Sequence, residues 1–126
     1  MNTIDNLPDE EWREITGYGG QYLISNMGRV KSLKGTNERI LKAFTNNHGY
    51  PRVALCHRGE SKRFLVSRLV AQEFCANPDP ENANTVDHID GNPLNNRAEN
   101  LRWLSMEDNI KEAVLRRNHR EAPQTP

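Results

Sequence analysis

The sequence predicts an α+β fold in which a small antiparallel β-sheet module with a short helix is followed by a ββα unit. Short apolar segments separated by glycines fill the first half of the chain, which is typical of a strand meander. One helical pattern follows, and a strand, a long loop, a second strand and a helix then succeed one another. The 126 residues, of which 35% are hydrophobic, fit one compact domain or two small modules sharing a core.

The sheet module is predicted at residues 11–76, after a flexible lead-in at residues 1–10. Its segments are rich in Val, Ile, Tyr and Phe, the residues that favour strands. The expected strands cover residues 12–15, 22–25, 29–33, 40–44, 52–57 and 63–66. Gly59 is expected to take a positive φ in a hairpin loop between the last two strands.

The short helix of this module is expected at residues 68–75, because apolar residues recur there at helical spacing. Ser67 precedes it and can cap its N-terminus. The proline-bearing segment 77–82 ends the helix and marks the boundary between the modules. Cys56 and Cys75 form no Cys-x-x-Cys pair, so two buried free thiols are expected in place of a disulfide framework or a structural zinc site.

The ββα unit is predicted at residues 77–120, before a proline-bearing tail at residues 121–126. Its elements are a strand at 85–89, a turn and irregular loop at 90–100, a strand at 101–104 and a helix after Ser105. The Ser105 hydroxyl can cap this helix, with Asp108 three residues later. Three apolar residues lie on one face of the helix, namely Ile110, Ala113 and Val114.

Charge is distributed unevenly although the formal net charge is zero. Residues 1–27 carry −4, residues 28–70 carry +8 from ten basic and two acidic residues, and residues 71–126 carry −4. A basic stretch of this kind can bind phosphates by displacing counterions, although a solvated surface with no ligand is the alternative. No apolar run approaches the ~18 residues of a membrane span, and no signal segment begins the chain, so a cytoplasmic protein without membrane contact is expected.

The ββα unit contains the residues best suited to chemistry. They are Asp87, His88, Asp90, Asn100, Asp108 and Asn109. The carboxylate of Asp87 and the amide oxygen of Asn109 are hard donors suited to one Mg²⁺ or Mn²⁺ ion, and two protein ligands leave most coordination positions open for water and phosphate. Such an ion stabilises charge in phosphodiester hydrolysis, and a neutral imidazole at His88 can act as the general base.

Asp87 and His88 are neighbours, which poses a geometric question. On a regular strand, adjacent side chains point to opposite faces of the sheet. The two residues can serve one site only if the strand ends or bulges there, and the turn residues Asp90 and Gly91 follow immediately. We therefore expect the site at the end of this strand.

These residues occur in motifs that closely resemble the His-Asn-His (HNH) endonucleases of phages and mobile introns, in particular the homing branch with a third signature Asn. The motifs are VDHIDGN at 86–92, NNR at 95–97, NLRW at 100–103 and EDN at 107–109. Upstream, EWREI at 11–15 and YLISNMGRVKSL at 22–33 resemble the modular DNA-binding motif that precedes such nucleases. FLVSRLVA at 64–71 resembles the segment leading into the catalytic unit.

The resemblance implies a ββα-metal (His-Me finger) nuclease unit. In it, Asp87 and Asn109 are metal ligands and His88 is the general base. Asn100 is a residue of the catalytic set whose side chain holds the loop and orients the histidine. The expected partner is double-stranded DNA, cleaved to 5′-phosphate and 3′-hydroxyl ends by a protein acting as a monomer in a bacterial host cell.

Basic residues of both modules are candidates for DNA contact. They are Arg29, Lys31, Arg52, Lys62, Arg63, Arg68 and Arg97. Two other functions stay open from the sequence. A non-cleaving DNA-binding module would bind DNA in a salt-sensitive manner without metal-dependent turnover. In a structural or interaction domain, the His and Asn residues would only brace loops, as Asp90, Asn92, Asn95 and Asn96 are expected to do.

Overall fold

The computed structural model describes residues 5–121, with side chains to residue 117. The predicted lead-in and tail therefore lie partly outside it. In chain order the elements are β1 (Trp12–Glu14), β2 (Tyr22–Ser25), β3 (Val30–Ser32), β4 (Arg39–Ile40), β5 (Phe44–Thr45), β6 (Pro51–His57), β7 (Glu60–Leu65), α1 (Val66–Phe74), β8 (Thr85–His88), the 3₁₀ turn η1 (Ala98–Asn100), β9 (Leu101–Leu104) and α2 (Met106–Glu121).

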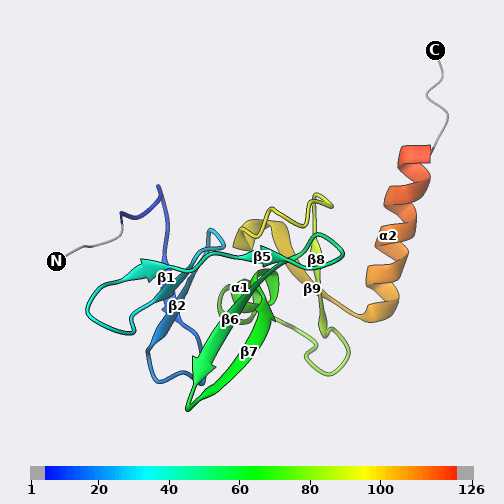
Figure 1. Ribbon diagram of the computed structural model, residues 1–126. Helices are drawn as coiled ribbons and strands as arrows, with labels where there is room; N and C mark the ends of the chain where they lie inside the picture. The colour runs from blue at the N-terminus through cyan, green and yellow to red at the C-terminus, as the bar shows by residue number, and fades with distance from the viewer. Residues whose placement is uncertain (1–4, 122–126) are drawn as a thin grey trace.

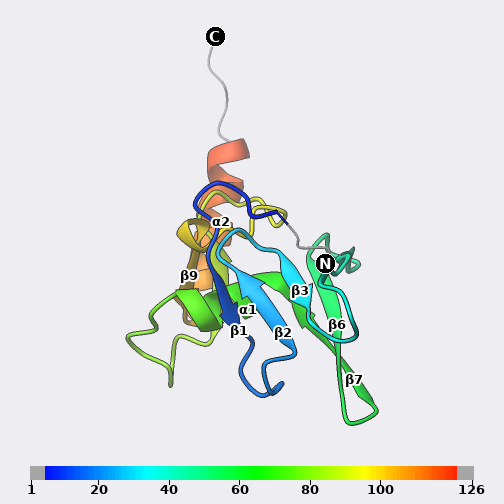
Figure 2. The same ribbon diagram turned by 90° about the vertical axis from the view of Figure 1, so that its left-hand side faces the viewer.

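The strands form three antiparallel sheets, in the orders β1-β2-β3-β4, β5-β6-β7 and β8-β9. Helix α1 lies among them and packs against β2, β6, β7, β8 and β9, whereas α2 stands at the far edge of the molecule (Figure 1). The largest fully buried apolar side chains are Ile24, Leu55 and Val70, from the first sheet, the second sheet and α1. Turning the molecule shows the first sheet and the β6–β7 hairpin on the side of α1 opposite to α2 (Figure 2). The predicted α+β class with antiparallel sheets and two helices is confirmed.

The β6–β7 hairpin confirms the prediction made for Gly59. Its strands pair from Arg52 with Leu65 to His57 with Glu60, which leaves a two-residue loop. Arg58 and Gly59 both have positive φ, 52° and 79°. Two positive φ values match the right-handed twist of the flanking strands, as in a type I′ turn.

Two predicted boundaries are wrong. Residues 40–44 do not form one strand, because Leu41 packs against the core and the chain passes there from β4 in the first sheet to β5 in the second. Helix α1 begins at Val66, so Ser67 lies inside the helix and is not its cap. The side chain of Val66 is buried in the core. The helix therefore follows β7 directly, and no side chain caps its N-terminus.

The cysteine prediction is half right. Both thiols are free, but Cys56 is exposed and Cys75 is partly buried. Alternation along β6 explains this, because Val53 and Leu55 point into the core and leave Cys56 on the outer face.

Residues 5–10 are attached to the first sheet. Arg29 donates to both carboxylate oxygens of Glu10 and to the Asp5 carbonyl, and Trp12 Nε1 donates to Asn6 Oδ1 at 2.9 Å. The described part of the lead-in is thus held by side-chain contacts. Neither α1 nor α2 is long and apolar enough, within the described residues, to cross a bilayer.

Candidate active site

Strand β8 answers the geometric question raised by the neighbouring Asp87 and His88. It pairs with β9 in regular register, Asp87 opposite Arg102 and His88 opposite Leu101, and it ends at His88. The two side chains therefore leave opposite faces of the strand, and their contacts differ accordingly. Because β8 ends at His88, both residues lie at the same end of the strand.

The imidazole of His88 is held on the face toward α1 and the second sheet. Its Nε2 lies 2.7 Å from Oδ1 of Asn96, in a buried contact. The Tyr50 ring lies 5.8 Å from the imidazole, since the loop between β5 and β6 reaches across to β8 (Figure 1). A cavity of about 260 Å³ opens beside His88, lined also by Ser67 and Arg68. The imidazole is thus fixed on one side and faces an open space on the other.

Asn96 is the site residue that sequence reasoning missed. It braces the turn as expected, since its Nδ2 donates to the Pro93 carbonyl at 3.2 Å, but the side chain is buried and its Oδ1 also contacts His88. The role of orienting the histidine had been assigned to Asn100, whose side chain makes different contacts. Asn100 Nδ2 donates to Asp90 Oδ1 and to the Asn95 carbonyl, both at 2.9 Å. Asn100 therefore holds the loop, as expected, while Asn96 contacts the imidazole.

The loop between β8 and β9 is a network of side-chain to backbone hydrogen bonds. Asp90 Oδ1 accepts from the Asn92 backbone N–H, and Asn92 Oδ1 accepts from that of Leu94, which confirms the two as turn residues. Hydrogen bonds from the Asn95 side chain, the Asn92 backbone and the Asn100 side chain lower the pKa of Asp90. Asp90 is consequently an ionised turn residue.

The first sheet supports this loop from outside. A Cβ added at Gly28, in the turn between β2 and β3, would lie 3.1 Å from the Asn96 carbonyl oxygen and 3.2 Å from its Cβ. The Ala98 N–H also donates to the Asn26 carbonyl at 2.8 Å. A glycine at position 28 therefore permits the close approach that positions Asn96 under His88.

The carboxylate of Asp87 lies on the other face of β8, toward α2. Its side chain is 2% exposed. Oδ2 accepts from Arg102 Nε at 2.9 Å, as expected for residues directly opposite each other on β8 and β9. Arg116 Nη2, from α2, lies 3.1 Å from Oδ1 and 3.2 Å from Oδ2. Both oxygens of this buried carboxylate are thus neutralised by guanidinium groups.

Asn109 approaches the same face. Its Nδ2 donates to Thr85 Oγ1 at 3.0 Å, and this hydroxyl donates to the Leu104 carbonyl at 2.7 Å. Thr85 and Asp87 are two residues apart on β8 and share a face, so Asn109 and Arg116 lie along one side of the strand. Helix α2 packs through these polar residues, and the apolar side chains of Ile110 and Val114 remain exposed. Ser105 caps α2 as predicted, since its Oγ accepts from the Asp108 N–H at 3.1 Å.

The donor set of this face suits a hard divalent cation. Among the side chains that the structure describes, those of residues 5–117, no group of three or more His, Cys, Asp or Glu could hold a metal. Asp87 offers two carboxylate oxygens, and the oxygen of Asn109 accepts no hydrogen bond from a described residue. Magnesium and manganese are commonly bound by one or two such ligands together with water and phosphate, whereas zinc favours His and Cys.

Two family models match the chain. Residues 10–56 match the NUMOD4 motif, and residues 65–111 match a model described as HNH endonuclease. The second match contains Asp87, His88, Asn100 and Asn109. This chain belongs to the HNH endonuclease family.

Named HNH endonucleases from phages are similar over most of the chain. DNA endonuclease I-HmuI of Bacillus phage SP01 is 42% identical over 84% of this chain and 59% of its own length. H-N-H endonuclease F-TflII of Escherichia phage T5 is 32% identical over 87% of this chain and 55% of its own length. This chain thus spans little more than half of these relatives.

The solved structure described as DNA binding and cleavage by the HNH homing endonuclease I-HmuI superposes with a TM-score of 0.76. It is 40% identical and covers 84% of this chain and 59% of that one. The HNH fold is therefore reproduced beyond the motif residues.

The basic residues expected on DNA differ in how far their charges are paired. Arg29 is bound to Glu10, and the buried Lys31 lies 3.4 Å from Glu38 and over the Trp12 ring. Arg68 donates to the Asn84 carbonyl and lies over Trp103. Arg97 lies 3.7 Å from Glu99. The remaining three, like Arg68, form no ion pair within the described chain. They are Arg52, Lys62 and Arg63.

Proposed function

We propose that this chain is a metal-dependent endonuclease that hydrolyses phosphodiester bonds of double-stranded DNA, in a ββα-metal unit formed by β8, β9 and α2. His88 is the general base, and one Mg²⁺ or Mn²⁺ ion is held by Asp87 and Asn109. The observation that carries the proposal is the buried His88 imidazole, hydrogen-bonded to Asn96 on one side and open to a cavity on the other. Similarity to I-HmuI supports the substrate.

The contacts of Asn96 support Nδ1 of His88 as the nitrogen that acts as the base. Asn96 Nδ2 donates to the Pro93 carbonyl at 3.2 Å, so Oδ1 is the atom facing His88 Nε2. An amide oxygen only accepts, and Nε2 must then carry the proton. The lone pair is left on Nδ1, which takes a proton from the attacking water.

The phosphate is expected at the end of β8, between the proposed metal ligands on one face of the strand and His88 on the other. An ion held by Asp87 and Asn109 would neutralise the scissile phosphate and stabilise the leaving 3′ oxygen. His88 withdraws the proton of the water from the other side, and Arg68 supplies positive charge beside the same cavity. This arrangement yields 5′-phosphate and 3′-hydroxyl products.

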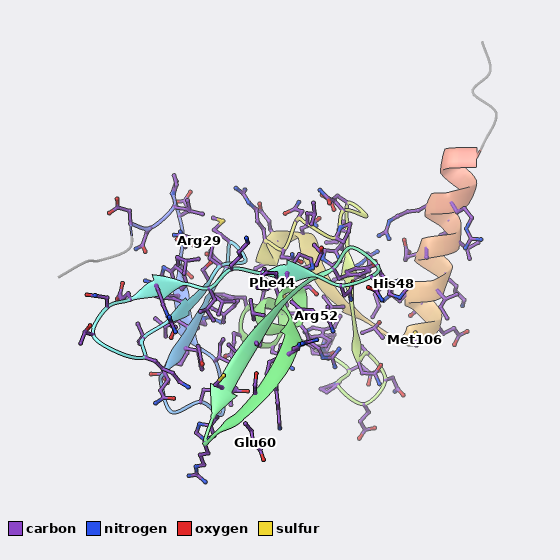
Figure 3. The ribbon with its side chains drawn as sticks, in the orientation of Figure 1. Arg29, Phe44, His48, Arg52, Glu60 and Met106 are labelled. Carbon is purple, nitrogen blue, oxygen red and sulfur yellow. The ribbon has the colours of Figure 1, made fainter. Side chains whose placement is uncertain are left out.

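The second sheet offers the basic surface that is most available to DNA. Phe44 of β5 pairs with Arg52 of β6, and the two labels lie near the centre of the view in Figure 3, to the right of Arg29. A second cavity, of about 340 Å³, lies on this sheet. Phe44, Arg52 and Arg63 of β7 line it. Guanidinium groups that form no ion pair with a described residue can bind phosphate and release counterions.

A plasmid assay tests the proposed function. The chain should convert supercoiled plasmid to nicked or linear forms with Mg²⁺ or Mn²⁺, and EDTA should abolish the conversion. Asp87→Ala should lose cleavage, while Asp79→Ala, an exposed loop residue, should retain it. Salt-sensitive DNA binding without cleavage by the unmodified chain would instead establish a non-cleaving DNA-binding module.

A further inference from the structure

Arg116 has a contact set unlike that of the other arginines. Its Nη2 lies 3.1 and 3.2 Å from the two oxygens of Asp87, 2.8 Å from the His88 carbonyl oxygen and 3.4 Å from that of Ile89. One nitrogen of a cationic group thus lies among four oxygens at the end of β8. Carboxylate and carbonyl oxygens are also what Mg²⁺ and Mn²⁺ bind in proteins.

The position of this guanidinium is built into the fold. Arg116 follows Asn109 by seven residues, two helical turns, so both reach the same side of β8. The side chain crosses Gly91, where an added Cβ would lie 3.0 Å from Cδ and 3.2 Å from Nε of Arg116. The turn after β8 therefore leaves room for the Arg116 side chain.

We propose that Arg116 occupies the cation position at Asp87 in the metal-free protein and competes with the divalent ion for this carboxylate. The inference rests on the proposed function, because it takes Asp87 as a metal ligand. A buried carboxylate needs a positive partner, and Arg102 supplies one that the β8–β9 register fixes and that Glu112 shares at 3.5 Å. Arg116 comes from α2 at the edge of the molecule and can withdraw when a divalent ion binds.

The competition predicts that removing Arg116 tightens metal binding. Mn²⁺ binding to the full chain is measured by titration calorimetry and by the EPR signal of free Mn²⁺. Arg116→Gln should lower the Kd for Mn²⁺ on the order of tenfold, since a charge-assisted contact no longer has to be broken. Arg116→Lys should fall between the two. Arg117→Gln, an exposed neighbour on the same helix, is the matched control and should leave the Kd within about twofold of the unmodified chain.

Thermal unfolding gives a second readout. Without metal, Arg116→Gln should melt at a lower temperature because Asp87 loses one partner, and Mn²⁺ should raise its melting temperature more than that of the unmodified chain. An unchanged or weaker Mn²⁺ affinity would overturn the inference and assign Arg116 a clamping role instead. Asp87→Asn separates the two proposals: if this variant binds Mn²⁺ as tightly as the unmodified chain does, the proposed metal site fails as well.

Discussion

Strand β8 presents His88 on one face and Asp87 on the other, and the polar groups of the two faces have different kinds of partner. On the His88 face, one hydrogen bond to Asn96 Oδ1 fixes the imidazole and a cavity remains beside it. On the Asp87 face, both carboxylate oxygens are bound by arginines, and the Asn109 amide nitrogen is bound by Thr85. Under the proposed function, the His88 face could receive a water molecule and a phosphate directly, whereas the Asp87 face would first have to exchange a partner.

The same contrast between paired and open groups recurs among the charges of the first two sheets. Arg29 is neutralised by Glu10, whereas Arg63 is exposed and has no ion pair in the described chain. A paired charge within the fold contributes mainly to stability, and an open one is available to a ligand. Sequence composition alone, which counts both as basic residues, does not separate them.

The largest expected effect comes from removing the group that faces the cavity. His88→Ala should reduce plasmid cleavage on the order of 10² to 10⁴-fold, because no other imidazole of the described chain contacts this cavity. His48→Ala, an exposed histidine of the β5–β6 loop, is the control and should cleave normally. DNA binding by both variants should match that of the unmodified chain. Normal cleavage by His88→Ala would remove the histidine from the mechanism.

The second prediction concerns Asn96, which contacts His88 but does not line the cavity. Asn96→Ala should reduce cleavage by about 10- to 100-fold, since the imidazole loses the partner that fixes its orientation and its protonated nitrogen. Asn92→Ala, in the exposed part of the loop, is the control.

The variant Asn96→Asp distinguishes positioning from a purely structural role. It keeps an acceptor for His88 Nε2, so it should recover much of the activity. Its carboxylate also favours the protonated imidazole, and the acidic limb of the pH profile should therefore move to higher pH. An unmoved profile, with Asn96→Ala still active, would show that this side chain only braces the loop.

The sequence predicted which elements carry the candidate residues but not the contacts between them. The motif residues placed Asp87 and His88 at the end of a strand and Asn109 in the following helix, as the structure has them. The contact between His88 and Asn96 was not predictable, because an asparagine in a turn-rich loop is usually bound to nearby backbone. The close approach of Gly28 to Asn96 is the other feature that indicates the position of Asn96. It joins residues some seventy positions apart in the sequence, so no local pattern predicts it.

The fold shows the same division. Alternation and glycines predicted most strands and the β6–β7 hairpin, because those signals are local. The split of residues 40–44 between two sheets and the start of α1 at Val66 depend on core packing of Leu41 and Val66. The contact of Arg116 with Asp87 likewise depends on how α2 packs on β8, which no local pattern in the sequence predicts.

A smaller effect on DNA affinity is expected from removing an arginine without an ion pair, compared with an arginine that has one. Arg63→Ala should weaken DNA binding by roughly threefold to tenfold and reduce the slope of log K against log salt by about one, as for the loss of one phosphate contact. Arg29→Ala should leave that slope unchanged and lower the melting temperature instead, because its charge is bound to Glu10. Equal salt slopes for the two variants would contradict the distinction.

The smallest expected effect concerns the paired carboxylate of Glu10 and appears in stability alone. Burial would raise its pKa, but hydrogen bonds from Arg29 and from the Leu7 backbone lower the pKa to about 2, against 4.5 for the free side chain. The folded state therefore binds the proton less readily than the unfolded state, so the pair stabilises the fold above pH 4.5 and this stability is lost as the pH falls from 4.5 toward 2. The Glu10 side chain is buried, but that of Arg29 is 23% exposed, so solvent screens the pair and its contribution is about 1 kcal/mol. Urea unfolding of Glu10→Gln should show that loss at neutral pH and a flatter dependence on pH below 4.5, with cleavage unaffected; a pH dependence identical to that of the unmodified chain would rule out this pair as the titrating group.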